Sequence, residues 1–577
     1  MRSFPIRQVA YSVPDSFLTL RWMARGQFSW EMGELPEGLY LRIVHGIGRP
    51  LCFRLVPMKG GRLCEVEEYT VSLTAGGVVI RIGADWLALT FERPDVLSIA
   101  GSGLGLRFDL PPEKFEYVAP YSPVRCLVNT YASRAQFMLE AQRGTMAVDA
   151  PYETKCCRYI HCDFQPDGSG HLQLTCDHFE KTWRASPRLA DARRSMAENQ
   201  ARFDAFRAGF SGIDPTDETA ELALFVLWSA VIPPHNLVKR RGVLMSNNWM
   251  LNVWTWDSAL NAMGLSLGDP ALAVDQLMFP YDNQAENGLL PDCVNPYAVV
   301  WNFTKPPVHG LAYVYFLRSV MTEAQVEPLY DGMAAQLDYW LREADSDGDG
   351  IPQYNHGNDC GWDNCTPFEV GAPVEGPDLS AYLALCMEAM ADMALRLNRP
   401  GESAAWREKS KSMIARLIEH SWDGKRFRVY QSGTHRVSPR GDSLYPYLPL
   451  VLGHRLPADV FQTMAAQLKL ERFLLTPYGL ATESTASPCY EADGYWRGPI
   501  WAPPMLFIIM GLHDGGDEAF ARDLALRFLR LCRRSGMAEN FNALTGEGLR
   551  DPAYTWTAST YLILASRYGL AQSDPIA

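Results

Sequence analysis

The sequence predicts a multidomain β + α chain, in which an N-terminal antiparallel β-sandwich precedes an (α/α)6 barrel. From about residue 38 to 180, short runs rich in β-branched and aromatic residues alternate with Gly, Pro, Asp and Ser, which is typical of a sandwich. Beyond about residue 215 the segments become long and helical in periodicity. Because 577 residues exceed what one hydrophobic core supports, we expect a β-sandwich domain at 1–185, a helical linker at 186–215 and a barrel domain at 216–577.

The strand and linker predictions depend on local composition. The clearest strand segments are YLRIVHG, LCFRLVP, GGVVIRIG, WLALTFE and HLQLTCD. The stretch 189–209 is polar and alternates in charge, which indicates a solvated connecting helix.

The barrel prediction depends on twelve helical segments, which pair into six hairpins. They are 218–232, 256–267, 270–281, 306–320, 323–343, 377–398, 401–420, 445–453, 457–469, 498–512, 516–534 and 554–569. Four of the connecting loops are long and rich in Trp, Asp, Asn, Gly and Pro: 282–305, 345–376, 476–497 and 536–553. Long loops in a compact domain are usually functional, so these loops are expected to line the barrel mouth.

Composition restricts the class of ligand. The net charge of −13 disfavours nucleic acid as a partner, since the basic cluster Lys239-Arg240-Arg241 is too short for a polyanion-binding surface. Aromatic residues make up 11% of the chain, and many of the 16 Trp stand beside Asp, Asn or Arg. Rings that stack on C–H faces, next to groups that bond hydroxyls, favour a small carbohydrate substrate.

The cysteine content and the apolar runs indicate in which cellular compartment the protein is expected. The 13 cysteines are odd in number and include the adjacent pair Cys156-Cys157, so they do not predict a disulfide framework. The longest apolar run, 222–232, is too short to span a bilayer, and the N-terminus lacks a continuous apolar segment. We therefore expect a soluble cytoplasmic protein with no membrane partner, either a monomer or a homo-oligomer.

The segment 358–368, NDCGWDNCTPF, places Asp363 between Trp362 and Asn364 in a turn without apolar periodicity. Cleavage of a glycosidic bond needs a carboxylic acid that stays protonated near neutral pH, and an aromatic wall can raise its pKa. Asp363 is therefore a candidate general acid. G-x-D-N is also ordinary turn chemistry, in which Asp or Asn bonds its own backbone.

Glu539, in the segment 537–548, is the candidate partner carboxylate. It follows a predicted helix and precedes a Gly-rich turn, so its side chain can point into a cavity. A solvated Glu in such a loop is the alternative. The next helix opens with the aromatic segment YTWTAS, at the same predicted end of the barrel.

Further polar and aromatic residues stand at loop-to-helix junctions and are candidate substrate-binding residues. They are Trp256, Asp257, Trp301, Asn302, Trp362, Trp496, Arg497 and Trp501. A carboxylate near a helix N-terminus is equally explained by the helix dipole, as for Asp257. A Trp-Arg pair is more often a surface stack, but four such clusters on one predicted face favour binding.

The stretch 345–357 resembles the start of a calcium loop. Asp345, Asp347 and Asp349 have the D-x-D-x-D-G spacing with Gly350 at the turn, but the twelfth position is His356 instead of a bidentate Glu. Bound structural Ca²⁺ and a plain acidic turn are both open. No cofactor is expected to be required. Cys360 and Cys365 have no second Cys or His pair in sequence, so they do not predict a zinc site.

Taken in order, the motifs W-x-W-D-S, G-W-D-N, Y-W-R-G-P-I-W and E-N-F-N-x-L-T-G-E resemble those of glycoside hydrolase family 63 and, more distantly, the trehalases. The likeness covers about residues 220–570. It implies an inverting, exo-acting α-glycosidase with a β-sandwich before an (α/α)6 barrel. By motif position, Asp363 matches the general acid and Glu539 the general base.

The same resemblance implies roles for the binding residues. Asp257 and Trp256 match the terminal-sugar subsite, and Arg497 and Trp496 match the substrate-binding W-R-G segment. Cys365 stands where the family commonly has Ser, and the residues before the Gly of G-W-D-N also differ, so the leaving-group preference is open. The W-R-G-P-I-W segment differs from the trehalase version, which disfavours trehalose.

An inverting pair must leave room for a water molecule, so the two carboxyl groups are expected to lie about 6.5–9.5 Å apart. An α-glucoside is the expected substrate, with mannose or another hexose as alternatives and a sugar or a small polyol acid such as glycerate as the aglycone. A polysaccharide lyase on a helical barrel and a noncatalytic carbohydrate-binding protein are the rival functions. Phosphorolysis is disfavoured, because no evident phosphate-binding cluster accompanies the acids.

Overall fold

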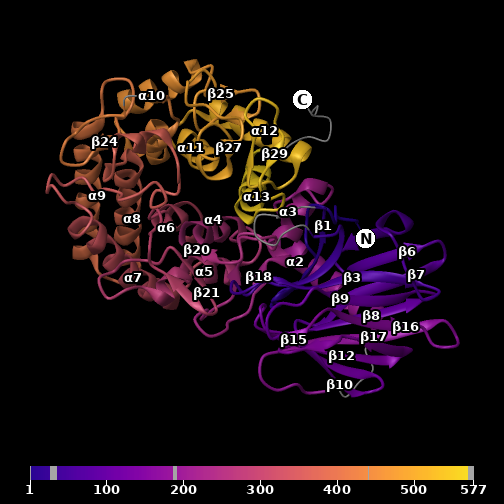
Figure 1. Cartoon of the computed structure of the whole chain (residues 1–577). Coiled ribbons are helices and arrows are strands. Elements are labelled where there is room, and N and C mark those ends of the chain that lie inside the picture. Colours follow the sequence, from indigo (N-terminus) through magenta and orange to yellow (C-terminus); the bar gives the residue numbers. More distant parts are fainter. Residues whose placement is uncertain (1, 26–34, 186–190, 439–440, 570–577) are drawn as a thin grey trace. The chain divides into compact units, whose positions relative to one another are not determined.

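The computed structural model describes residues 2–25, 35–185, 191–438 and 441–569. Contacts divide the chain into two compact units (Figure 1). Unit 1 comprises residues 1–208, 225–233 and 246–251, and unit 2 comprises 209–224, 234–245 and 252–577. Between residues 209 and 251 the chain passes from one unit to the other several times, so a single boundary in the sequence does not separate the two units. The predicted domain boundaries at 185 and 215 stay a prediction.

Unit 1 contains two antiparallel sheets, as predicted. Among the described residues one sheet has seven strands, in the order β1 (Leu18–Met23), β2 (Gly38–Ile43), β3 (Leu51–Lys59), β9 (Gly105–Leu110), β16 (Ile160–Gln165) and β13 (Thr145–Asp149), with β4 (Arg62–Leu63) on β3. The other has eight, in the order β10 (Tyr117–Ser122), β11 (Arg125–Thr130), β12 (Ala135–Arg143), β17 (His171–Phe179), β8 (Val96–Ser102), β7 (Asp85–Arg93), β6 (Gly77–Ile82) and β5 (Thr70–Thr74).

Side chains from both sheets meet in the core of unit 1. Phe53 of β3 packs edge-on against Phe108 of β9 at 5.4 Å and against Phe137 of β12, in the other sheet, at 5.2 Å between ring centres. The thiols of Cys126 and Cys162 also meet across the two sheets at 3.9 Å. Burial alternates along β16, which places one face of that strand inward, as a sandwich requires.

Two features of unit 1 differ from the sequence prediction. The first strand begins at Leu18, well before residue 38, and all six residues of β1 are buried, so it lacks the alternating polarity that identifies a half-buried strand. The helix expected at 189–209 is α2 (Ala192–Gly209), and residues 186–190 lie outside the described residues. Phe203 of α2 packs edge-on against Phe4, so the inner face of this polar helix is attached to unit 1.

Unit 2 contains the helices of the barrel, and each of the twelve predicted segments contains a helix. Within the described residues these are α3 (Glu218–Ser229), α4 (Thr255–Leu265), α5 (Pro270–Met278), α6 (His309–Ala312) continuing into η3 (Tyr313–Leu317), α7 (Glu323–Arg342), α8 (Pro377–Arg396), α9 (Pro400–Ser421), η5 (Tyr445–Arg455), α10 (Ala458–Leu470), α11 (Ala502–Asp514), α12 (Glu518–Ser535) and α13 (Thr555–Tyr568). The (α/α)6 architecture follows from the pairing of successive helices.

Two of the helical segments are not regular α-helices. The segment predicted at 306–320 begins only at His309, after Pro306 and Pro307, and its second half, η3, is π-helical. The segment predicted at 445–453 is a 3-10 helix that contains Pro449. Proline lacks an N–H and clashes with the preceding turn, which accounts for the late start of the first segment and for the irregular second one, whereas the π-helical half contains no proline.

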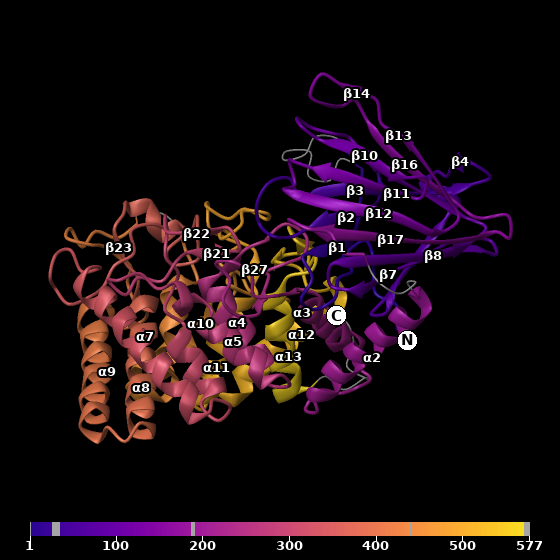
Figure 2. The ribbon, with the colours of Figure 1, turned by 90° about the horizontal axis from the view of Figure 1, so that it is seen from below.

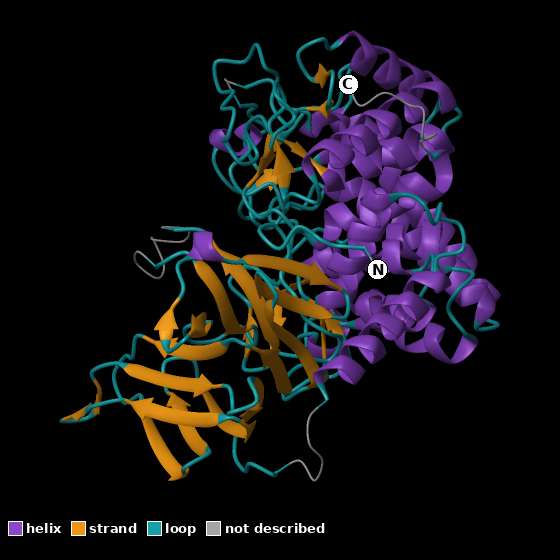
Figure 3. Ribbon diagram, turned by 90° about the vertical axis from the view of Figure 1, so that its right-hand side faces the viewer, coloured by secondary structure: helices purple, strands orange, loops and turns teal. Residues whose placement is uncertain are grey.

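The long loops gather at one end of the helices. Figure 2 shows β21 (Cys293–Asn295), β22 (Ala298–Val300), β23 (Val374–Glu375) and β27 (Ile500–Trp501) together above the ends of α7, α8, α9 and α11. Figure 3 shows these loops and short strands on one side of the helices. The residues predicted to carry chemistry therefore lie at the barrel mouth. In the described part of the chain, no helix has the length and apolar character needed to cross a membrane.

The contact between Phe53 and Phe137 tests the sandwich core. Both rings are fully buried, so Phe53→Ala should leave a cavity and lower the free energy of unfolding of unit 1 by about 3–5 kcal/mol. Denaturant unfolding measures this change. Phe115→Ala is the control, because that ring is 40% exposed and its removal should change stability little. Equal effects of the two substitutions would contradict this description of the core.

Candidate active site

The loop that carries Asp363 is fitted closely against Trp256. Gly361 has φ +75°, a conformation that favours glycine, and a Cβ atom there would lie 2.6 Å from the indole of Trp256. Both constraints require glycine before Trp362. Since Asp363 follows two residues later, the position of the carboxylate depends on this close approach.

Asn364 attaches the same loop to the Y-W-R-G segment. Its side chain donates to the carbonyl of Gly494 at 3.0 Å and accepts the N–H of Trp496 at 3.0 Å. Its own carbonyl accepts a hydrogen bond from Nε of Arg497 at 2.7 Å, and Arg497 also pairs with Glu369 at 2.9 Å. Arg497 thus holds two loops together, and its predicted contact with substrate stays a prediction.

The structure brings four predicted tryptophans into one cluster. Trp496 stacks on Trp501 at 3.9 Å with an interplanar angle of 6°, and on Trp362 at 4.9 Å. Trp256 and Trp501 each pack edge-on against Trp556, which the sequence analysis did not select. All five side chains are nearly fully buried, so little of their ring surface is open to solvent. They form one hydrophobic cluster, and Asp363 directly follows one of its members, Trp362.

The environment of Asp363 raises its pKa. Burial is the largest cause, the negative charge of Asp292 adds to it, and the positive charge of Lys305 opposes it. A raised pKa is what the general-acid prediction requires. The role itself stays a prediction.

Glu539 lies immediately before β28 (Asn540–Phe541), which pairs with β27 so that Trp501 is opposite Asn540. This pairing brings Glu539 beside the Trp cluster, and Nε1 of Trp556 donates to its carbonyl oxygen at 3.2 Å. The side chain is 4% exposed. Burial, followed by the negative charge of Asp551, raises its pKa to about 8.

The charges of the site's carboxylates affect Tyr495. After burial, the charges of Glu539, Asp363 and Asp257 raise its pKa. Asp257 accepts a hydrogen bond from the hydroxyl of Tyr554 at 3.3 Å, and burial raises the pKa of Asp257 well above its ordinary value. Asp257 is thus bonded to a tyrosine hydroxyl, and the charges of all three carboxylates raise the pKa of Tyr495. The separation of Asp363 and Glu539 stays a prediction.

Lys305 is a charged residue of this region that sequence reasoning missed. Its ammonium lies 3.0 Å from Oδ1 of Asp292 and donates to the carbonyl of Asn358 at 2.8 Å. It is 5% exposed, and its charge lowers the pKa of both Asp257 and Asp363. A single Lys before two prolines has no distinguishing pattern, so only the fold reveals this position.

Trp301 and Asn302 lie in a different environment from the other candidates. Both are exposed, and they line a pocket together with Tyr339 and His356. The lining of that pocket includes neither Asp363 nor Glu539. Contact between these two residues and a substrate stays a prediction.

The residues that depart from the family pattern near Asp363 have structural contacts. The carboxylate of Asp359 accepts the backbone N–H groups of Thr304, Asn355 and His356 at 3.0–3.1 Å, which shapes the loop. The thiol of Cys360 donates to the carbonyl of Gly357 at 3.0 Å, and burial raises its pKa well above its ordinary value. Cys365 is also buried.

The acidic stretch predicted to bind calcium forms a turn. The two carboxylate oxygens of Asp345 accept the N–H groups of Gly348 and Gly350 at 2.9 and 3.0 Å, as expected for a self-bonded acidic turn. Oxygen atoms of Asp345, Asp347 and Asp349 nevertheless lie within 4.8 Å of one another. Calcium binding by this group stays a prediction.

Comparison with known families gives the site a context. Residues 250–557, more than half of the chain, match the family described as mannosylglycerate hydrolase MGH1-like glycoside hydrolase domain. The chain belongs to this glycoside hydrolase family. The matched region contains Asp363, Glu539 and the Trp cluster. Membership disfavours the lyase alternative, because the family's members are hydrolases.

Individual relatives agree with this assignment. The chain is 26% identical over 408 residues to the mannosylglycerate hydrolase of Rubrobacter radiotolerans, which covers 54% of the chain and 89% of that protein. It is 22% identical over 409 residues to the glucosylglycerate hydrolase of Mycolicibacterium hassiacum, with 54% and 91% covered.

Solved structures confirm the fold. The GH63 mannosylglycerate hydrolase of Thermus thermophilus in complex with Tris matches with a TM-score of 0.51 and 18% identity, over 59% of this chain and 98% of that one. A bacterial glucoamylase complexed with acarbose matches with a TM-score of 0.64 and 11% identity, over 97% of this chain and 93% of that one. The second match extends over both the sheets and the barrel.

The raised pKa of Glu539 predicts a pH dependence of stability. The folded protein holds this proton up to pH about 8, whereas an unfolded Glu releases it near 4.5. Stability is therefore lost as pH rises through this range. Glu539→Gln removes that loss, so the variant should unfold at a higher temperature than the wild type at pH 9 and show no such advantage at pH 4. Thermal unfolding measures both.

Glu547→Gln is the matched control, since Glu547 is exposed in the same hairpin. Its unfolding temperature should equal that of the wild type at both pH values. A Glu539→Gln variant that is no more stable at pH 9 would contradict the burial argument.

Proposed function

We propose that the chain is an inverting, exo-acting α-glycosidase that hydrolyses a small α-hexoside, most readily one whose aglycone is glycerate. The observation that carries the proposal is that Asp363 directly follows Trp362 and Glu539 directly precedes Asn540, the residue paired with Trp501, so both carboxylates adjoin one cluster of buried tryptophans. The choice of glycerate as the aglycone comes from the two relatives described above, because both are hydrolases of hexosylglycerates by name.

In the proposed reaction, Asp363 gives its proton to the glycosidic oxygen as the bond to the anomeric carbon breaks. Glu539 takes a proton from a water molecule whose oxygen attacks that carbon from the opposite face. The products are the free hexose with inverted configuration and the protonated aglycone. Burial favours the protonated form of Asp363, and a raised pKa makes Glu539 a stronger proton acceptor once it is ionised.

Asp257 and Trp256 are proposed to bind the terminal sugar, with Trp496 and Arg497 completing the binding segment. An acidic aglycone also needs a cation. Arg550 is the proposed cation. Its guanidinium lies 5.8 Å from the ring centre of Tyr495, and its charge lowers the pKa of Glu539. It also pairs with Asp493 at 2.9 Å, so it would have to bind the aglycone beside that carboxylate.

An α-glucoside is the proposed substrate. The name of the relative from Rubrobacter radiotolerans favours an α-mannoside as the second candidate. All thirteen cysteines are free, which supports the proposed cytoplasmic setting, since reducing compartments keep thiols unpaired.

Product analysis tests the reaction class. The purified protein is incubated with α-glucosylglycerate and, separately, α-mannosylglycerate, and the first-formed anomer is followed by ¹H NMR. We expect the β-anomer of the hexose to appear first and then mutarotate. An α-anomer as the first product would contradict inversion, and no hydrolysis of any α-hexoside in a broad panel would contradict the proposed function.

The proposed role of Asp363 predicts a leaving-group effect. Asp363→Asn should lower kcat on α-glucosylglycerate about 10²–10⁴-fold, because a poor leaving group depends on proton donation. Hydrolysis of 2,4-dinitrophenyl α-glucoside, whose leaving group needs no proton, should fall much less. Steady-state kinetics on both substrates gives the comparison.

Glu547→Gln is the control substitution, since Glu547 is exposed and has no proposed contact with substrate. It should retain kcat on both substrates. If Asp363→Asn lowered kcat equally on both substrates, Asp363 would not be the general acid.

A further inference from the structure

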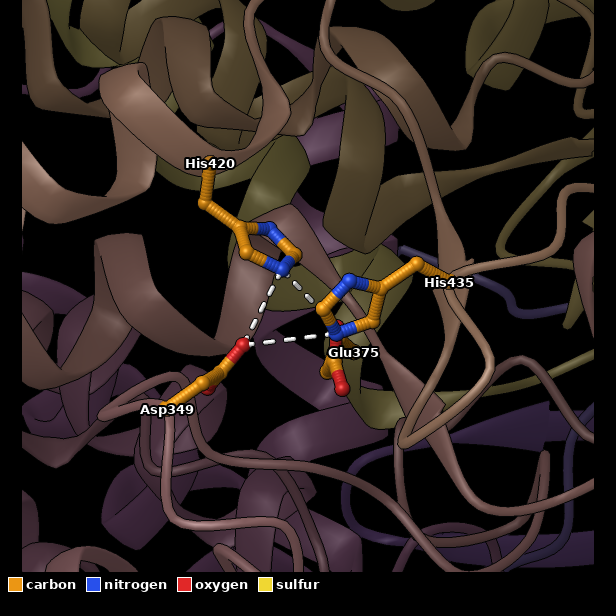
Figure 4. A group of neighbouring side chains, drawn as sticks. All are labelled: Asp349, Glu375, His420 and His435. Atoms are coloured by element: carbon orange, nitrogen blue, oxygen red, sulfur yellow. Dashed lines mark ion pairs between the residues drawn. The ribbon is translucent and has the colours of Figure 1, made fainter.

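Four side chains that are distant in sequence meet on unit 2, apart from the carboxylates assigned above. Asp349 lies in the loop after α7, Glu375 in β23, His420 in the last turn of α9 and His435 after β24 (Tyr430–Gln431). One potential ligand atom from each lies within 4.8 Å of all the others. Figure 4 shows the two imidazoles and the two carboxylates directed toward a common centre.

The distances from His420 to the two carboxylates are those of a metal coordination shell, and the distances from His435 are longer. Nε2 of His420 lies 3.2 Å from Oδ2 of Asp349 and 3.1 Å from Oε2 of Glu375. Nε2 of His435 lies 3.6 and 4.0 Å from the same two oxygens. A tetrahedral zinc ion with ligands at about 2.0–2.1 Å places neighbouring ligand atoms about 3.3 Å apart. A small movement of His435 closes the shell.

Glu375 supplies independent evidence for a cation. Its carboxylate is fully buried, and apart from Nε2 of His420 neither of its oxygens has a hydrogen-bond donor nearby. By contrast, the buried carboxylate of Glu483 accepts hydrogen bonds from Thr366, Ser487 and the N–H of Asp442. A buried carboxylate without donors is costly unless a positive charge faces it. Among the described residues, the imidazole nitrogens of this cluster are the basic groups within ion-pair distance of Glu375.

The imidazole of His420 is oriented as a ligand. Its Nδ1 lies 2.9 Å from Oγ of the buried Ser421, so a proton on Nδ1 can be donated to that hydroxyl. The lone pair of Nε2 then faces the carboxylates. Histidine ligands of metals are commonly held in this way by a hydrogen bond from the other ring nitrogen.

The two carboxylate oxygens of Asp349 have different contacts. Its Oδ1 accepts the N–H of Ile351 at 2.8 Å, and its Oδ2 faces both histidines. Asp347 lies beside the cluster, where its Oδ2 accepts the N–H of Gly433 at 2.7 Å and lies 3.5 Å from Nε2 of His435. The hairpin that carries His435 is thereby held next to the acidic loop.

We propose that Asp349, Glu375, His420 and His435 bind a divalent metal of the zinc class. Imidazole nitrogen is a ligand that Zn²⁺ and similar ions accept and that Ca²⁺ and Mg²⁺ disfavour. This site differs from the predicted calcium loop in its ligands, since it uses Asp349 alone of the three aspartates. His435 is 49% exposed, which gives the ion a route to the site.

The bound ion would join four segments of unit 2. Asp349 and Glu375 lie near the two ends of the long loop 345–376, which contains Asp363, and the histidines come from α9 and from the hairpin after β24. Closing this loop on the helix is a structural role. The proposal does not depend on the proposed hydrolase reaction, because its measurement needs no substrate.

Metal binding to the full chain tests the proposal. The protein is stripped with EDTA, dialysed, and titrated by calorimetry with ZnCl₂ and, separately, with CaCl₂. We expect one Zn²⁺ per chain with a Kd below about 1 µM, and a rise of several °C in the unfolding temperature when Zn²⁺ is in large excess. With Co²⁺, visible d–d absorption should report histidine-containing tetrahedral coordination.

His435→Gln is the principal variant, because the side chain is half exposed and its loss should leave the fold intact. It should weaken Zn²⁺ binding at least 10-fold and remove the thermal shift. Glu375→Gln is the second variant and should act in the same direction. His454→Gln is the control, since His454 pairs with Asp514 elsewhere on the surface, and it should bind Zn²⁺ like the wild type.

Absence of Zn²⁺ binding would overturn the proposal and leave the cluster as an imidazolium–carboxylate ion pair. Zn²⁺ binding that survives both His435→Gln and Glu375→Gln would also overturn it, since the thiols would then be the ligands. Tighter binding of Ca²⁺ than of Zn²⁺ would do the same.

Discussion

The stack of indoles formed by Trp362, Trp496 and Trp501 is the interaction on which the loops at the barrel mouth depend. Each ring comes from a loop or a strand that would otherwise have little apolar surface to bury. Burying large aromatic side chains against one another stabilises these segments and fixes the backbone beside them. Asp363 follows one of these rings directly, and Glu539 lies next to the residue paired with another.

The same packing also determines the electrostatics. Side chains that exclude water raise the pKa of Asp257, Asp363 and Glu539, because the charged form of each loses its hydration. Tyrosine hydroxyls and Lys305 offset part of this cost. A site with several buried carboxylates and one buried ammonium is costly for stability, and such costs are commonly retained where chemistry requires them.

Much of the fold was predictable because it is encoded locally. Each helical segment carries its own apolar periodicity, and the loops are recognisable by their Gly, Pro and Asn content. The strand β1 was missed because all of its residues are buried, so its sequence does not alternate. The irregular segments η3 and η5 show the limit of periodicity, which does not distinguish an α-helix from a π or 3-10 helix of similar pattern.

By itself, the sequence determined the fold class, the loops that carry the chemistry, and Asp363 and Glu539 as the candidate pair, since each stands in a short motif. Only the tertiary structure revealed Lys305 and the cluster that includes His420 and His435. These residues have no pattern of their own, and their partners lie tens of residues away. Contacts between successive hairpins of a barrel are set by how the helices pack, which no local stretch of sequence records.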